Sequence, residues 1–189
     1  MSDAAKLSPG KVASQWWDEF CEPEKGDRAV RAKLRRCKGW QDAMLVPAAL
    51  LLAARLGMKR DHPWDIENAL DLAVVLAHVK ERSKTPLFQS CGFTKPPQSK
   101  ESSPEQPRLA VVRFTRLMRS TRDELPLALI RLVRLLDGTA NIEGLTQAIL
   151  DWDKPHWGDH VRRDWAFDYY GARLSNNETT KSDTEGTNP

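Results

Sequence analysis

Residues 65–80, DIENALDLAVVLAHVK, are the stretch that decides the fold. Apolar side chains occur at the helical period and cover almost every side of the segment. A helix with so little polar surface is stable only when other helices cover it. The stretch, which opens on Asp65, therefore predicts the buried central helix of an N-terminal helical bundle.

The rest of the chain also has a helical period nearly everywhere, and few segments are typical of strands. Asp27 is expected to cap the second helix, and Asp123 the helix that begins there. Pro47 either kinks its helix or marks the true first turn. Besides 65–80, the predicted helices cover residues 11–21, 26–37, 41–57, 107–120, 123–138, 141–152 and 154–172.

The helical pattern breaks at residues 83–106, SKTPLFQSCGFTKPPQSKESSPEQ, where proline, serine and charged residues dominate. Such a segment is a linker or an ordered but irregular loop. We therefore expect an all-α protein with an N-terminal bundle over 11–82 and a C-terminal bundle over 107–174. Residues 175–189 have no sizeable apolar side chain and are expected to be disordered.

Composition limits the possible functions. The chain has 189 residues, 40% of them hydrophobic, which is enough for a core, and its formal net charge is only +3. Any affinity for nucleic acid must therefore come from where the charges lie. The N-terminus lacks an apolar signal core, and no apolar run approaches the ~20 residues that span a bilayer. We expect a cytoplasmic protein that does not contact a membrane, with its three widely spaced cysteines reduced.

Two segments concentrate positive charge. RFTRLMRSTR (113–122) has four arginines, and no carboxylate occurs between Pro107 and Arg122. On a helix with 100° per residue, one side of this segment is apolar and comprises Ala110, Val111, Phe114, Leu117 and Met118. The opposite side carries Arg108, Arg116 and Arg119, and the flanks carry Arg113 and Arg122. Residues 27–38 carry six cations and one acid. Clustered like charges favour a polyanionic partner such as a nucleic-acid backbone, although a merely solvated face is the alternative.

Motifs that carry chemistry are scarce. The sequence has no P-loop, G-x-G-x-x-G, H-E-x-x-H or G-x-S-x-G. His156 and His160 have the spacing of metal ligands but no third ligand nearby, so surface histidines are the favoured interpretation. We expect no catalysis, no cofactor and no metal. The seven tryptophans favour core packing, and stacking on unpaired bases is the alternative.

A series of segments carries a family resemblance. The segments are, in chain order, GDRAVRAKLRRC, PAALLLAARLG, LAHVK, RFTRLMRS, LIRLVRLLDG, ILDWDKP and VRRDWAFDYYGA. Together they resemble the CasB family, the small subunit of the type I-E CRISPR surveillance complex Cascade. The resemblance runs from about Val12 to Ala172. It implies two helical bundles without enzymatic activity. It also implies contacts with crRNA, with the single-stranded DNA of the R-loop, with the backbone and large subunits, and with a second copy of the chain.

The resemblance also implies which residues bind nucleic acid. The leading candidates are Arg113, Arg116 and Arg119, followed by Arg131 and Arg134. Arg162 and Arg163 match a basic pair, although nearby acids make a local salt bridge an alternative. The N-terminal candidates, which face either nucleic acid or a neighbouring subunit, are Arg28, Arg31, Arg35 and Arg36. A helical DNA- or RNA-binding regulator and a purely structural adaptor are the other functions that this pattern allows.

Overall fold

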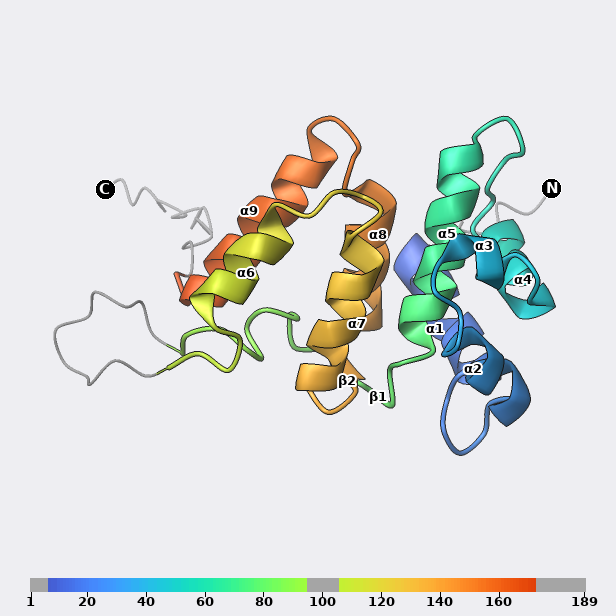
Figure 1. Cartoon of the computed structure of the whole chain (residues 1–189), viewed down its shortest axis with the longest axis horizontal. Coiled ribbons are helices and arrows are strands. Elements are labelled where there is room, and N and C mark those ends of the chain that lie inside the picture. The colour runs from blue at the N-terminus through green and yellow to red at the C-terminus, as the bar shows by residue number, and fades with distance from the viewer. Residues whose placement is uncertain (1–6, 95–105, 173–189) are drawn as a thin grey trace, which may run out of the picture.

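The computed structural model describes residues 7–94 and 106–172, and their fold is all-α as predicted (Figure 1). The predicted disordered tail and residues 95–105 of the predicted loop lie outside the described residues. The N-terminal helices are α1 (Pro9–Phe20), α2 (Arg28–Leu34), α3 (Trp40–Ala43), α4 (Pro47–Arg55) and α5 (Pro63–Leu76). The C-terminal helices are α6 (Val111–Met118), α7 (Leu125–Leu135), α8 (Ile142–Asp151) and α9 (Trp157–Tyr170).

Helix α5 occupies the centre of the molecule, which confirms the prediction of a buried helix. Every residue from Ala69 to Leu76 is buried. The helix packs against α3 and α4 on one side and against α7 and α8 on the other. It begins at Pro63, two residues before the predicted start, because proline is well suited to the first turn of a helix. Asp65 therefore lies within the first turn.

The N-terminal helices follow their sequence signals closely. Asp27 caps α2, and its carboxylate accepts hydrogen bonds from the backbone N–H groups of Ala29 and Val30 at 2.8 and 3.0 Å. Pro47 is the first residue of α4, so the predicted helix 41–57 is two helices and the first-turn interpretation of this proline is correct. Proline has no N–H to donate to the preceding turn and cannot continue α3.

The C-terminal helices surround an aromatic core. Val161, Trp165 and Tyr169, four residues apart on α9, are all buried. The capping prediction for Asp123 was wrong, since Glu124 holds the N-cap position of α7, and its side chain accepts from the backbone N–H of Thr121 instead of capping the helix.

The segment between β1 and α6 is ordered where the structure describes it. Phe88 is fully buried and lies 4.5 Å from the ring of Trp165 and 5.3 Å from that of Phe114, measured between centroids. The hydroxyl of Tyr169 donates a 2.6 Å hydrogen bond to the carbonyl of Leu109. These contacts make the segment an irregular part of the core and hold the entry to α6 against α9.

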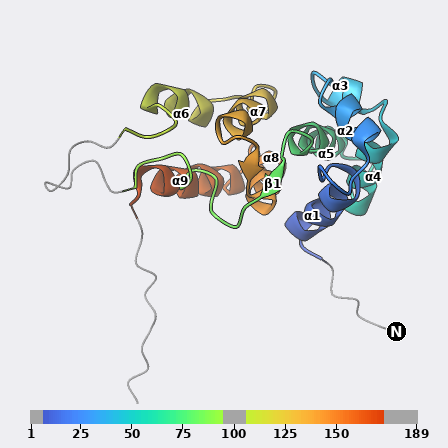
Figure 2. The same cartoon turned by 90° about the horizontal axis from the view of Figure 1, so that it is seen from below.

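The two bundles share one continuous core. Helices α1 and α5 both pack on α8, and the chain after α5 forms a short parallel pair between β1 (Glu81–Arg82) and β2 (Thr139–Ala140). Viewed from below, α2, α7 and α6 lie in one layer, and α1, α8 and α9 lie in the other (Figure 2). Helices α2, α6 and α7 therefore lie toward the same side of the molecule.

Candidate nucleic-acid interface

A groove between α6 and α7 is the most distinctive surface feature of the C-terminal bundle. Its volume is about 650 Å³. Helix α6 contributes Arg113 and Arg116, and α7 contributes Arg131. The other residues that line this α6–α7 groove are Leu109, Leu117, Ser120, Asp123, Glu124, Leu127, Ala128, Leu132 and Leu135.

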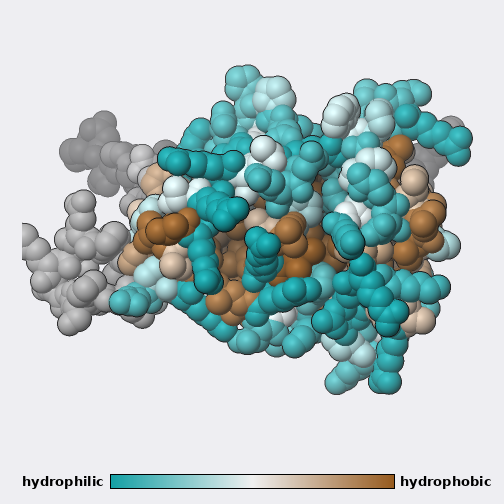
Figure 3. Space-filling view, in the orientation of Figure 1, coloured by the Kyte–Doolittle hydropathy of each residue, from teal (hydrophilic) through white to brown (hydrophobic). Residues whose placement is uncertain are grey.

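The three arginines of the groove are exposed, and none of them forms an ion pair with a carboxylate among the described residues. Unpaired guanidinium groups keep all of their N–H donors available to an anion. In the space-filling view, hydrophilic side chains over α6 and α7 stand apart from one another, with apolar surface visible between them (Figure 3). The groove therefore combines positive charge with an apolar floor.

The apolar side of α6 is narrower than the sequence predicts. Phe114 and Leu117 are buried as expected. Ala110 and Val111, expected on the buried side, are both exposed, since they lie at the very start of α6, where Ala110 is the N-cap. Val112, which fitted the pattern poorly, is 80% exposed. The exposed arginines Arg113, Arg116 and Arg119 thus share their helix with two exposed valines.

Arg122, at the flank of the predicted stripe, belongs to the fold and not to the groove. Its guanidinium lies 2.7 Å from the carboxylate of Glu67 and 2.6 Å from the side-chain oxygen of Asn68. It also stacks over the Trp64 ring at 4.7 Å from the centroid. These contacts fasten the α6–α7 connection to α5.

A second group of arginines lies around His78, just beyond the end of α5. Arg31 donates from Nε to the carbonyl of Ala77 and from Nη2 to that of Val79, both at 3.2 Å. Its guanidinium therefore spans His78, the residue between those two carbonyls. The backbone N–H groups of Lys80 and Glu81, which follow in the chain, both donate hydrogen bonds to the carbonyl of Gly138, just beyond α7.

His78 itself is buried at this junction, and its Nδ1 has no hydrogen-bond partner among the described residues. Burial and, after it, the positive charges of Arg134, Arg35 and Arg31 together lower the pKa of His78 to about 4. The imidazole is therefore neutral at pH 7. Three guanidinium groups from two different bundles act on one site.

The two groups of arginines connect along α7. Arg131 lines the groove, Arg134 lies three residues further toward the junction, and residues at this spacing are neighbours on a helix surface. We call the surface that they form the basic face; it comprises Arg35, Arg134, Arg131, Arg116 and Arg113. Its members come from α6, from α7 and from the end of α2, helices that lie toward the same side of the molecule (Figure 2).

The other candidate arginines are placed differently. Arg28, Arg36 and Arg119 are exposed near the ends of α2 and α6, outside the lining of the groove. Arg162 is held by the fold, since it donates to the carbonyl of Trp152 at 3.2 Å and lies 4.1 Å over the Trp152 ring. Arg163 is exposed, but its helix α9 lies in the layer opposite α6 (Figure 2).

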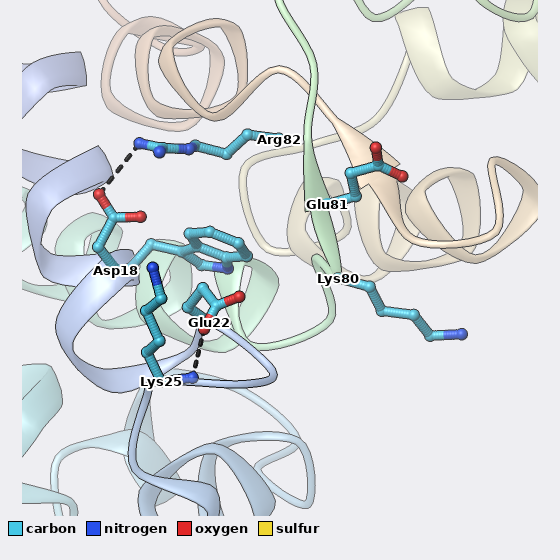
Figure 4. Close-up of a pocket in the computed structure, with 7 residues that line it drawn as sticks. Asp18, Glu22, Lys25, Lys80, Glu81 and Arg82 are labelled. Atoms are coloured by element: carbon cyan, nitrogen blue, oxygen red, sulfur yellow. Dashed lines mark hydrogen bonds and ion pairs between the residues drawn. The ribbon is translucent and has the colours of Figure 1, made fainter.

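A second hollow, of about 430 Å³, lies between α1 and β1 (Figure 4). Its charges are mixed and partly satisfied within the chain. Arg82 pairs with Asp18 at 3.0 Å, and Glu22 accepts a backbone N–H hydrogen bond from Lys25. Because carboxylates and cations alternate around it, this hollow has no preference for an anion.

Metal-ligating side chains do not gather in the part of the chain that the structure describes. Across residues 7–94 and 106–172, no group of three or more His, Cys, Asp or Glu residues is arranged to hold a metal ion. None of the helices in these ranges has the length and apolar character that crossing a membrane requires. The three cysteines are free, and burial raises the pKa of both Cys21 and Cys91 to about 12.

Two features of this surface were not predicted from the sequence. The first is the apolar floor of the groove, and the second is the convergence of arginines on His78. A signal for the floor was present, because LPLALIRLVRLL (125–136) has more leucines than one buried helix face requires. No local signal could reveal the His78 junction, which depends on how three helices meet.

Comparison with known proteins agrees with this architecture. A family model described as CRISPR-associated protein Cse2 matches residues 30–170. The fold is similar to that of CasB from Thermus thermophilus, with a TM-score of 0.57, 21% identity, and 88% of this chain and 100% of that one covered. It is also similar to CasB from M. ruber, with a TM-score of 0.58, 17% identity, and coverage of 87% and 94%.

No curated protein matches the chain. The family match nonetheless covers well over half of the sequence, and it confirms the resemblance to CasB that the ordered sequence segments carry. The chain belongs to the Cse2 family of CRISPR-associated proteins, also called CasB, the small subunit of the type I-E Cascade complex.

Proposed function

We propose that the chain is a non-catalytic Cascade subunit whose basic face binds the backbone of single-stranded nucleic acid and stabilises the R-loop. The displaced non-target DNA strand is the main ligand, and crRNA and the target strand are further contacts. The observation that carries the proposal is the row of arginines along α2, α7 and α6, none of them paired with a carboxylate among the described residues.

The mechanism is electrostatic and independent of sequence. Arginine forks hold phosphates through paired N–H donors and release the counterions that surround the strand. Formation of a guide–target heteroduplex is nearly balanced in free energy by loss of the DNA duplex. A few phosphate contacts to the displaced strand are then enough to slow its return to the duplex.

The proposal assigns different roles to the candidate arginines. Residues of the basic face contact phosphates directly, and the exposed Arg28, Arg36 and Arg119 extend the field of positive charge around it. Arg31 and Arg162 have a structural role, since they hold carbonyl groups just beyond α5 and at the end of α8. The remaining contacts, with the backbone and large subunits and with a second copy of the chain, use surfaces outside the basic face.

Charge reversal at the end of α6 tests the proposal. The double variant R116E/R119E is expected to weaken binding of single-stranded DNA, measured by fluorescence anisotropy, because two cations near the strand become anions. The dependence of log K on log salt concentration should become shallower by about 0.7 for each phosphate that the protein no longer binds.

R163E is the matched control, since Arg163 is an exposed arginine on α9 in the opposite layer. It should leave both affinity and salt dependence close to those of the wild type. Unchanged binding by R116E/R119E with a normal circular dichroism spectrum would contradict the proposed function. A preference for duplex of particular sequence would instead indicate a helical regulator.

A further inference from the structure

We infer that the α6–α7 groove receives an unpaired nucleobase from the strand whose phosphates the neighbouring arginines hold. This inference rests on the proposed function and adds a second recognition element to it. Phosphate binding alone accounts for the arginines, but it gives no reason for an open apolar floor beneath them.

The floor is built from leucines of both helices. Leu109, Leu117 and Leu132 are buried, and they form its base. Leu127 is 51% exposed, so the groove keeps apolar surface in contact with water. A ligand that covers this surface gains roughly 25 cal/mol for each Å² of apolar area removed from water.

The charges around the groove orient such a ligand. Arg113, Arg116 and Arg131 attract phosphate, whereas Asp123 and Glu124 line the end where residues 119–124 connect the two helices. The carboxylates repel a phosphate at that end, so the sugar–phosphate backbone lies along the arginines. The uncharged base is the part of a nucleotide that fits over the leucines.

The same arrangement distinguishes a single strand from a duplex. Bases in a duplex are stacked and paired and are unavailable to a groove on a protein surface, whereas bases of a separated strand are free. The volume of about 650 Å³ lies within the range of sites for small organic ligands. Because leucine surface offers no hydrogen-bond pattern, the groove should accept any base.

The test compares two oligonucleotides of equal length, oligo(dT) and its abasic analogue, which carry the same phosphates. Wild-type protein should bind oligo(dT) about threefold to tenfold more tightly than the abasic strand. L127N should reduce this difference by weakening only oligo(dT) binding, because a polar group then occupies the floor. R113Q/R116Q/R131Q should weaken binding of both strands.

L45N is the matched control, because Leu45 is 80% exposed between α3 and α4 and lies outside the groove. It should leave both affinities unchanged. Equal affinity of the wild type for the two strands would overturn the inference and leave the proposed function intact. If the triple arginine variant binds both strands as tightly as the wild type, the proposed function fails as well.

Discussion

R122Q tests whether Arg122 stabilises the fold and lies outside the proposed binding surface. Glutamine removes the positive charge and cannot reach Glu67, Asn68 and the Trp64 ring together. The Arg122 and Glu67 side chains are only 14% and 20% exposed. Removing one partner of a fully buried ion pair costs about 3–5 kcal/mol, and this pair is somewhat more accessible.

We therefore expect R122Q to lower the free energy of unfolding by about 2–3 kcal/mol. The cation–π contact with Trp64 contributes about 0.5–1 kcal/mol of that decrease. For a chain of this length, such a change lowers the melting temperature by about 5–10 °C. Urea unfolding followed by circular dichroism gives the free energy directly, and the m-value should not change.

R119Q is the matched control, since Arg119 is exposed and no hydrogen bond or ion pair from its side chain is seen among the described residues. It should change stability by less than about 0.5 kcal/mol. The two variants should show the reverse order in single-stranded DNA binding, where R119Q has the larger effect. If R122Q is as stable as R119Q, the contacts with α5 are not what holds the connection 119–124 in place.

Three further predictions concern the interior. D71N should stabilise the protein by about 2–3 kcal/mol at pH 7. Burial raises the folded-state pKa of Asp71 to about 6, so its ionisation at pH 7 costs folding free energy that asparagine does not. In urea unfolding, the wild type should gain stability as the pH falls from 7 to 4, and D71N should lack this gain. H78Q should reduce the decrease in stability between pH 6.5 and pH 4, since the unfolded chain takes up a proton that the folded His78, with its pKa of about 4, does not. This effect is best measured with D71N as the parent, where the opposite contribution of Asp71 is absent. G158A should lower the melting temperature strongly, because its Cβ would lie 2.1 Å from the carbonyl oxygen of Trp152. G144A is the control and should be neutral or stabilising, since the nearest atom to its Cβ, the Asn141 side-chain oxygen, lies at 3.5 Å. Equal melting temperatures of the two variants would contradict the packing described for α9.

The helical elements were predictable because their signals are local. The apolar residues of 65–80, the cap at Asp27 and the break at Pro47 act within a turn or two of the chain. The tryptophans divide according to neighbours that the sequence does not reveal. Trp16, Trp17, Trp152 and Trp165 are buried, whereas Trp64 and Trp157 are exposed.

The candidate site was predictable in its charges but not in its shape. The stripe on α6 indicated a polyanion, and periodicity placed both Arg113 and Arg122 at its flanks. Of these two, Arg122 is held by the fold, whereas Arg113 lines the groove. The α6–α7 groove lies beside the connection 119–124, whose Arg122 contacts Glu67 and Asn68 of α5, more than fifty residues earlier in the chain. Such long-range contacts also decide that Arg162 packs on Trp152.

R-loop lifetime in the assembled complex tests the central claim most directly. The subunit with Arg35, Arg113, Arg116, Arg131 and Arg134 changed to glutamine is assembled with the other Cascade subunits and crRNA, and its content in the complex is checked against the wild type. After target binding, the displaced strand should re-anneal at least about tenfold faster than with the wild-type subunit. An R-loop of unchanged lifetime, with the variant subunit present in full amount, would contradict the account.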